Sequence, residues 1–138
     1  MLRFLKKIIV NIVLLALVAT FTGCDNKENT EIVKEVKSPN GYYTAYAAIC
    51  SNGATTPFEP RVAVISSKAS KEDVDKLLSE GGNVYSATRS YDKKIDIKWE
   101  DDDNLLITYS NEDSDIYNKS DIFHGIKIKY KKISKWNL

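Results

Sequence analysis

The sequence has few of the residues on which several classes of protein depend. Its 138 residues include two cysteines and one histidine, too few for a disulfide-stapled scaffold or a histidine-rich metal site. Neither sign of charge is in excess, because 20 lysines and arginines stand against 19 acidic residues. This balance argues against a strongly basic nucleic-acid-binding protein and against an acidic disordered tail. The length suits one domain and is too short for the four or more blades of a β-propeller.

The first 23 residues have the pattern of a secretory signal peptide. Arg3, Lys6 and Lys7 form a basic start, and an apolar run from 8 to 22 follows. That run has 15 residues and contains Asn11, whereas a membrane-spanning helix needs about 20 apolar residues. A short apolar run after a basic start is typical of an export signal rather than of a full membrane span.

The end of this segment carries a lipidation motif. The pair Gly23-Cys24, with Phe21 at a position that is usually leucine, resembles the lipobox of bacterial lipoproteins. In that family the cysteine sulfur receives a diacylglycerol and the chain is cut before it. The resemblance implies a signal peptide over 1–23, lipidation at Cys24 and attachment to the extracytoplasmic face of the cell membrane. An uncleaved membrane helix is the alternative, and it leaves the domain on the same side.

Cleavage before Cys24 changes the charge of the protein. It removes three of the 20 bases and no acidic residue, so the mature chain carries 17 bases against 19 acids. A mildly acidic domain has no electrostatic reason to bind nucleic acid. The polar residues 24–31 predict a short tether, followed by a single domain over 32–138.

The domain has mostly strand-like periodicity. Apolar and charged residues alternate strictly over 94–100 and 125–131, which indicates antiparallel strands with one solvated face. Turn signals such as Ser38-Pro39-Asn40-Gly41 separate the other apolar runs. The pattern predicts about seven strands, over 32–36, 42–50, 61–65, 83–87, 94–100, 104–109 and 125–131.

One segment has helical periodicity. Ser70 is a suitable N-cap, and Val74, Leu77 and Leu78 fall on one side of a helix. Gly81-Gly82 would end it. We therefore predict a β-rich α+β fold, in which a twisted antiparallel sheet of about seven strands packs against one short helix over about 70–80.

The order of the short motifs resembles a family of small membrane-anchored extracytoplasmic bacterial proteins of unknown function. The resemblance covers about residues 35–132 and implies an extracytoplasmic β-rich domain, without an activity or a ligand. The motifs are Ser38-Pro39-Asn40-Gly41-Tyr42-Tyr43, Gly53-Ala54-Thr55-Thr56, Gly82-Asn83-Val84-Tyr85, Ile95-Asp96-Ile97-Lys98-Trp99, Leu105-Leu106-Ile107-Thr108-Tyr109 and Gly125-Ile126-Lys127-Ile128.

No residue pattern indicates catalysis, a metal site or a cofactor. His124 has no nucleophile at a suitable spacing, and Ser90-Tyr91-Asp92-Lys93 has the Ser-x-x-Lys spacing without companion motifs. Cys50 ends an apolar strand and has no neighbouring base. The acidic runs 100–103 and 112–115 lack calcium-loop spacing. The sequence therefore predicts a protein that is not an enzyme, although a small cell-envelope hydrolase stays open as an alternative.

Two groups of side chains are candidates for binding. Tyrosine combines an apolar ring with a polar hydroxyl, and lysines along one strand can meet an anionic surface or guard a sheet edge. We expect an interaction module whose partner is an envelope protein or a wall polymer, and an immunity-type inhibitor of a secreted toxin is a further alternative. The candidate residues are Tyr42, Tyr43, Tyr46, Lys127, Lys129 and Lys131.

Overall fold

The structure is a computed structural model that describes residues 1–3, 28–53, 56–88, 94–110 and 115–134. Most of the expected signal peptide, together with Cys24, lies outside these residues. Within the described ranges, no helix is both long and apolar enough to cross a membrane. The elements are β1 Asn29–Lys37, β2 Tyr43–Ser51, β3 Glu59–Ser66, α2 Lys71–Ser79, β4 Tyr85–Thr88, β5 Ile95–Asp101, β6 Asn104–Ser110, β7 Asp115–Lys119, β8 Ile122–Phe123 and β9 Ile126–Ile133.

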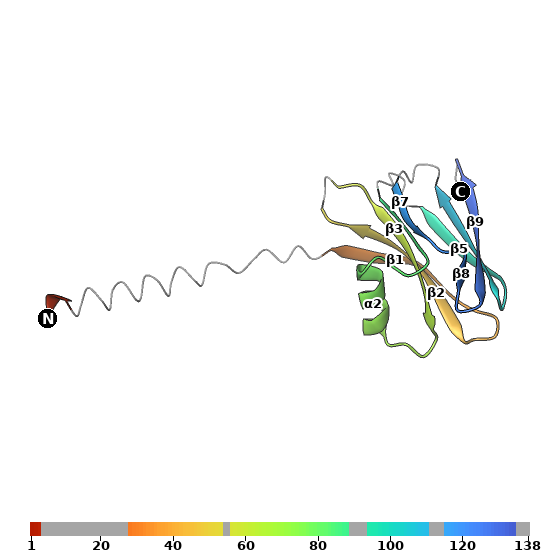
Figure 1. The fold of residues 1–138 in the computed structure, drawn as a ribbon, viewed down its shortest axis with the longest axis horizontal. Helices are drawn as coiled ribbons and strands as arrows, with labels where there is room; N and C mark the ends of the chain where they lie inside the picture. Colours follow the sequence, from red (N-terminus) through yellow and green to blue (C-terminus); the bar gives the residue numbers. More distant parts are fainter. Residues whose placement is uncertain (4–27, 54–55, 89–93, 111–114, 135–138) are drawn as a thin grey trace.

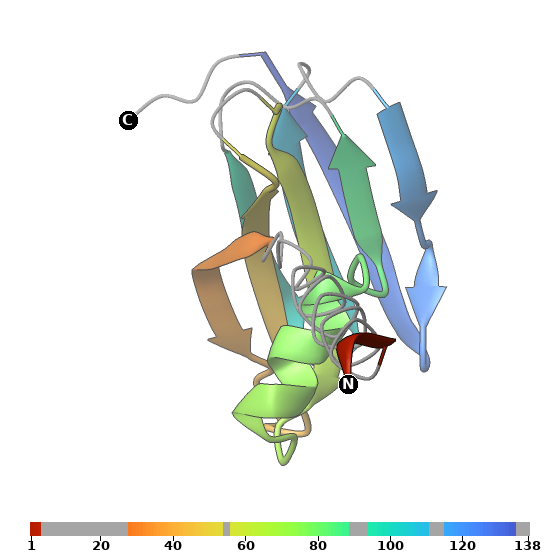
Figure 2. The ribbon, with the colours of Figure 1, turned by 90° about the vertical axis from the view of Figure 1, so that its left-hand side faces the viewer.

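The nine strands of the described residues form two sheets. The first has the order β1-β2-β3-β4-β7 and the second has the order β5-β6-β9-β8. Neighbouring strands are antiparallel except for β6 and β9, which run parallel. The helix α2 lies against the first sheet, on the side away from β5 and β9 (Figure 1; Figure 2 gives the view from the helix side). The molecule therefore has three layers, in the order helix, first sheet and second sheet.

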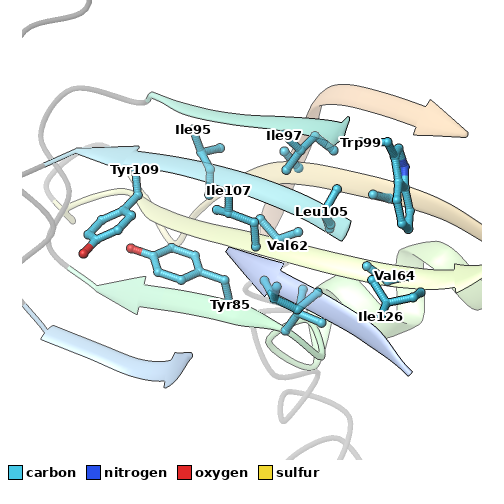
Figure 3. Close-up of a cluster of buried hydrophobic side chains, with 14 of the residues drawn as sticks. Val62, Val64, Tyr85, Ile95, Ile97, Trp99, Leu105, Ile107, Tyr109 and Ile126 are labelled. Atoms are coloured by element: carbon cyan, nitrogen blue, oxygen red, sulfur yellow. The ribbon is translucent and has the colours of Figure 1, made fainter. Parts of the chain in front are cut away.

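The main core fills the space between the two sheets. Alternate residues of β5 and β6 are buried, among them Ile97 and Ile107, and they pack with residues of β3 and β4 such as Val62 and Tyr85. Figure 3 shows these side chains meeting between the strands. Each large apolar side chain that is removed from water contributes about 1.5–3 kcal/mol. The strict alternation in the sequence is thus the pattern of a sheet that buries one face.

The helix covers the outer face of the first sheet. Val74 and Leu78 of α2 pack on Ala48 of β2 and Ala63 of β3, and the small alanine side chains allow the helix to approach the sheet closely. Ser70 is the N-cap and forms a capping box with Asp73. The strands β2 and β3 are consequently buried on both faces, which explains their nearly continuous burial.

Polar contacts join the two sheets at both lateral edges. At one edge, the indole Nε1 of Trp99 in β5 donates to the carbonyl oxygen of Val36 in β1 at 2.9 Å. At the other edge, the hydroxyl of Tyr130 in β9 donates to the carbonyl oxygen of Ser120, 2.7 Å away, where the chain passes from β7 to β8. These bonds fix the position of one sheet relative to the other.

The predicted fold class, a β-rich α+β protein with one short helix, is confirmed. All seven predicted strands are present, as β1 to β6 and β9, and the helix lies within the expected range. The arrangement differs in two respects, because the strands form two sheets and one pair is parallel. In addition, β1 begins at Asn29, so the last three residues of the expected tether over 24–31 belong to the sheet.

Candidate binding site

The end of the sandwich opposite to the amino-terminal entry carries four connections among the described residues, and we call it the distal end. The strand β1 starts at Asn29 and reaches the turn at 38–42 after nine residues, a distance of about 30 Å at 3.3 Å per residue. Because Tyr43 is the register partner of Ser66, the connection from β3 to α2 lies beside this turn. The turn between β8 and β9, at 124–125, is the third connection. The acidic turn between β5 and β6 is the fourth, because the N–H of Lys127 donates to the carbonyl oxygen of Asp103 at 2.7 Å.

Two neighbouring hollows lie at the distal end. One has a volume of about 370 Å³ and the other about 280 Å³, and both are lined by Tyr43 and Ser66. The first is completed by Gly41, Tyr42 and Lys68. The second also has Val64, Ile65, Asn83, Phe123 and His124 in its wall. Four separate segments of the chain therefore build this site.

The three candidate tyrosines do not share one surface. Tyr42 precedes β2 and is 73% exposed beside the first hollow, whereas Tyr43 is half-buried and packs on the core between the sheets. Tyr46 packs on the opposite side, in the cluster under the helix, where burial and then Glu35 raise the pKa of its hydroxyl. Tyr43 and Tyr46 therefore lie on opposite faces of β2, because positions an odd number of residues apart in a strand face opposite sides.

Local hydrogen bonds hold Tyr42 in place. The buried Ser38 donates through Oγ to Asn40 Oδ1 at 2.8 Å and accepts from the backbone N–H of Tyr43 at 3.1 Å. Asn40 Oδ1 also accepts from the N–H of Tyr42 at 3.1 Å. Gly41 has a φ of +78°, which few other residues adopt readily. The turn predicted from Ser38-Pro39-Asn40-Gly41 is therefore present, and it presents the Tyr42 ring to solvent.

The amide of Asn83 fixes the floor of the second hollow. The pairing of β3 with β4 extends only to Val62, and beyond it the Asn83 side chain takes the place of a neighbouring strand. Its Oδ1 accepts from the N–H of Val64 at 2.8 Å, and its Nδ2 donates to the carbonyl oxygen of Val64 at 2.7 Å. The backbone of β3 is thus satisfied while its next side chains stay open to the hollow.

His124 has a strained backbone at the edge of the same hollow. Its φ is +47°, and it is the one non-glycine residue with positive φ in the part of the chain that the structure describes. Gly125 follows with a φ of +81°, so the two residues form the tight connection of the β8–β9 hairpin. The His124 ring meets the Phe123 ring edge-on, with 4.5 Å between centroids. Strain of this kind is often retained where a side chain has a function.

Replacing His124 by asparagine is expected to stabilise the fold. Asn-Gly is the preferred pair for such a two-residue turn, so the strain is relieved and the free energy of unfolding should rise by about 0.5–1 kcal/mol. Urea unfolding of the full chain in mild detergent measures this difference. An Asn52→His variant, which changes an exposed residue of ordinary backbone conformation, is the reciprocal control and should leave the stability nearly unchanged. A loss of stability in His124→Asn would contradict the strain argument.

The candidate lysines lie elsewhere. Lys127, Lys129 and Lys131 alternate with the inward-facing residues of β9, so they are on the outer face of the second sheet and are exposed. Lys129 lies 2.6 Å from Glu100, whose hydrogen bond and charge raise the pKa of the lysine. The short β8 pairs with β9 only at Ile126 and Lys127. The N–H of Ile128 also donates to the carbonyl oxygen of Asp121 at 2.9 Å. Beyond it, among the described residues, Lys129 and Lys131 follow an open edge, where lysine discourages strand addition.

Other candidate chemistry is placed apart from the hollows. Cys50 is buried with its Sγ 3.4 Å from Thr30 Oγ1, and burial raises the pKa of its thiol, which suppresses the reactive thiolate. Within 28–53, 56–88, 94–110 and 115–134, no group of three or more His, Cys, Asp or Glu side chains is arranged to hold a metal ion. The Ser90–Lys93 motif and residues 112–114 lie outside the described residues.

Sequence reasoning identified two of the residues around the hollows as binding candidates, Tyr42 and Tyr43. It considered His124 only as a catalytic group and did not propose Ser66, Lys68, Asn83 or Phe123 for binding. One usable signal was present, because Phe123-His124-Gly125 directly precedes a strictly alternating strand and so suggests a tight hairpin turn. Comparison of the chain with family models, curated proteins and solved structures gave no significant match.

Proposed function

We propose that this protein is a lipid-anchored, non-enzymatic binding module on the extracytoplasmic face of the cell membrane. Its binding site is the pair of distal hollows. The observation that carries the proposal is the exposed ring of Tyr42, held by a hydrogen-bonded turn beside hollows that are lined by other aromatic side chains. Aromatic rings with a polar edge are typical of binding surfaces.

The position of the lipid anchor places the hollows on the side of the domain that faces away from the membrane. Cys24 is only four residues from Glu28, where the described domain begins, and the hollows are at the far end of β1. A diacylglycerol supplies two acyl chains, which makes membrane attachment stable. The anchor confines the module to a thin layer in which the distal end faces away from the lipid, and this confinement raises its effective concentration toward neighbouring partners.

The hydrolase alternative receives less support from the same surface. Glycoside hydrolysis requires two carboxyl groups in one cleft, and neither hollow has an acidic residue among its described lining residues. A groove between β1 and α2 contains Glu28 and Asp75, but Glu28 is already paired with Arg61 at 2.5 Å. An immunity-type inhibitor would bind its target through the same distal hollows. It would differ from the proposed binding module only in the identity of the partner, a secreted toxin.

Site-specific photo-crosslinking in intact cells tests the proposal. A benzophenone amino acid replaces Tyr42 in one strain and Tyr117 in another, because these tyrosines are 73% and 55% exposed but lie on different parts of the molecule. We expect a discrete crosslinked product from position 42 and none from position 117. Crosslinking only from position 117 would instead place the contact on β7, and equal background at both positions would contradict a distal binding site.

A further inference from the structure

Lys68 is the one lysine, arginine, aspartate or glutamate among the described lining residues of the two hollows. The acidic turn at 101–103 belongs to the same end of the sandwich but lines neither hollow. Lys68 is exposed at the rim of the first hollow, and His124 is exposed at the rim of the second. Among the described lining residues there is no aspartate or glutamate. The mature chain as a whole would carry 17 bases against 19 acids, so the positive charge of Lys68 at this site is opposite to that average. Charge complementarity at the rim of a site selects the partner more than it adds affinity.

The floor of the second hollow is apolar. Val64 is fully buried, and Tyr43 and Phe123 are half-buried members of the core cluster that reach the hollow. The amide of Asn83, the polar group at this floor, is already bonded to the backbone of Val64. A sugar-phosphate wall polymer would bring hydroxyl groups against this floor without compensating hydrogen bonds, which is unfavourable. An aliphatic or aromatic side chain would bury apolar surface there without that penalty.

We infer that the distal hollows bind an acidic peptide segment of a partner protein, with one apolar side chain in the hollow beside Phe123 and an adjacent carboxylate at Lys68. This inference rests on the proposed function and adds the chemical class of its ligand. The two hollows share Tyr43 and Ser66, so neighbouring residues of one peptide can occupy both of them. A volume of about 280 Å³ is below the usual size of a drug-like site and suits a single side chain.

Three short peptides test the inference on the full chain in detergent micelles. The probes are acetyl-Gly-Glu-Phe-Glu-Gly-amide, the same peptide with lysine in place of glutamate, and the same peptide with serine in place of phenylalanine. A glycerol phosphate oligomer represents the wall polymer. Saturation-transfer NMR measures binding of each probe. We expect the acidic phenylalanine peptide to bind at least about fivefold more tightly than the other three.

Two variants with the same change in net charge distinguish binding at the hollows from attraction to the overall charge of the protein. Lys68→Glu is expected to lower the affinity for the acidic peptide by about fivefold and to raise the affinity for the basic peptide. Lys98→Glu, on the outer face of the second sheet, should leave both affinities unchanged. Equal effects of the two variants, or no preference for the acidic peptide, would overturn the inference. Preferred binding of the glycerol phosphate oligomer would also overturn it. Crosslinking at position 42 tests the distal binding site without the peptides. The proposed function can therefore hold even if the acidic peptide does not bind, and the two results are distinguishable.

Discussion

Replacing Arg61 by alanine is expected to lower the free energy of unfolding by about 3–5 kcal/mol, because it leaves buried charged and polar groups without their partner. The Arg61 side chain is 7% exposed and pairs with Glu59 at 2.7 Å and with Glu28 at 2.5 Å. Its Nη1 also donates to the carbonyl oxygens of Leu78 and Ser79 at 2.8 and 3.1 Å. One side chain thus connects the start of the domain, β3 and the end of α2.

The environment keeps Arg61 charged. Burial acts against the charged guanidinium, but the hydrogen bonds to Glu28 and Glu59 outweigh it and raise the pKa of Arg61. The carbonyl groups at the carboxyl end of a helix carry partial negative charge, which favours a cation at that position. Alanine would remove all of these contacts and leave a cavity beneath α2. The loss should therefore exceed that of an exposed ion pair, which contributes at most about 1 kcal/mol.

Urea unfolding of the full chain in mild detergent, followed by tryptophan fluorescence, measures the effect. Arg61→Lys is the informative second variant, since lysine keeps the charge but lacks the planar fork that reaches carboxylates and carbonyls together. We expect it to recover only part of the stability. Lys68→Ala, at an exposed position, is the control and should change stability by less than about 0.5 kcal/mol. A loss below 1 kcal/mol in Arg61→Ala would show that the buried network is not stabilising.

The elements that sequence analysis predicted are those with a one-sided burial pattern. Residues 94–100 alternate because Ile95, Ile97 and Trp99 face the core, and the helix has Val74 and Leu78 on one side. The missed strands lack that signal. Only one of the five residues of β7 is even partly buried, so no alternation marks it. The two residues of β8 are too few to establish a period.

The arrangement of strands depends on contacts that periodicity does not encode. A period of two assigns side chains to faces, but it does not specify which strands pair or whether two sheets form. The parallel pairing of β6 with β9 requires the chain to pass through β7 and β8 first. The hollows depend on the same packing, because it brings Tyr43, Lys68, Asn83 and Phe123 together from distant parts of the sequence. The candidate site was therefore only partly predictable.

Replacing Cys24 by alanine is expected to abolish lipid attachment completely. In the lipoprotein interpretation the thiol of Cys24 is the atom that carries the diacylglycerol, and alanine has no group that can replace it. Each buried methylene contributes about 0.8 kcal/mol to membrane binding, so the loss of two acyl chains should release any mature chain from the membrane. The intact mass of the membrane-extracted protein measures this. The expected wild-type mass is that of a chain beginning at Cys24 with the added lipid.

The second cysteine provides the matched control. Cys50 is fully buried in β2, beside Thr30, and it is not adjacent to a signal sequence, so Cys50→Ala should retain the lipid-modified mass. An unmodified full-length mass in the wild-type protein would contradict lipidation and make residues 4–23 a retained membrane helix. The β-rich domain would then still extend from the membrane through its amino-terminal end. In that case the distal hollows would keep their direction, because β1 rather than the chemistry of the anchor separates them from the point of attachment.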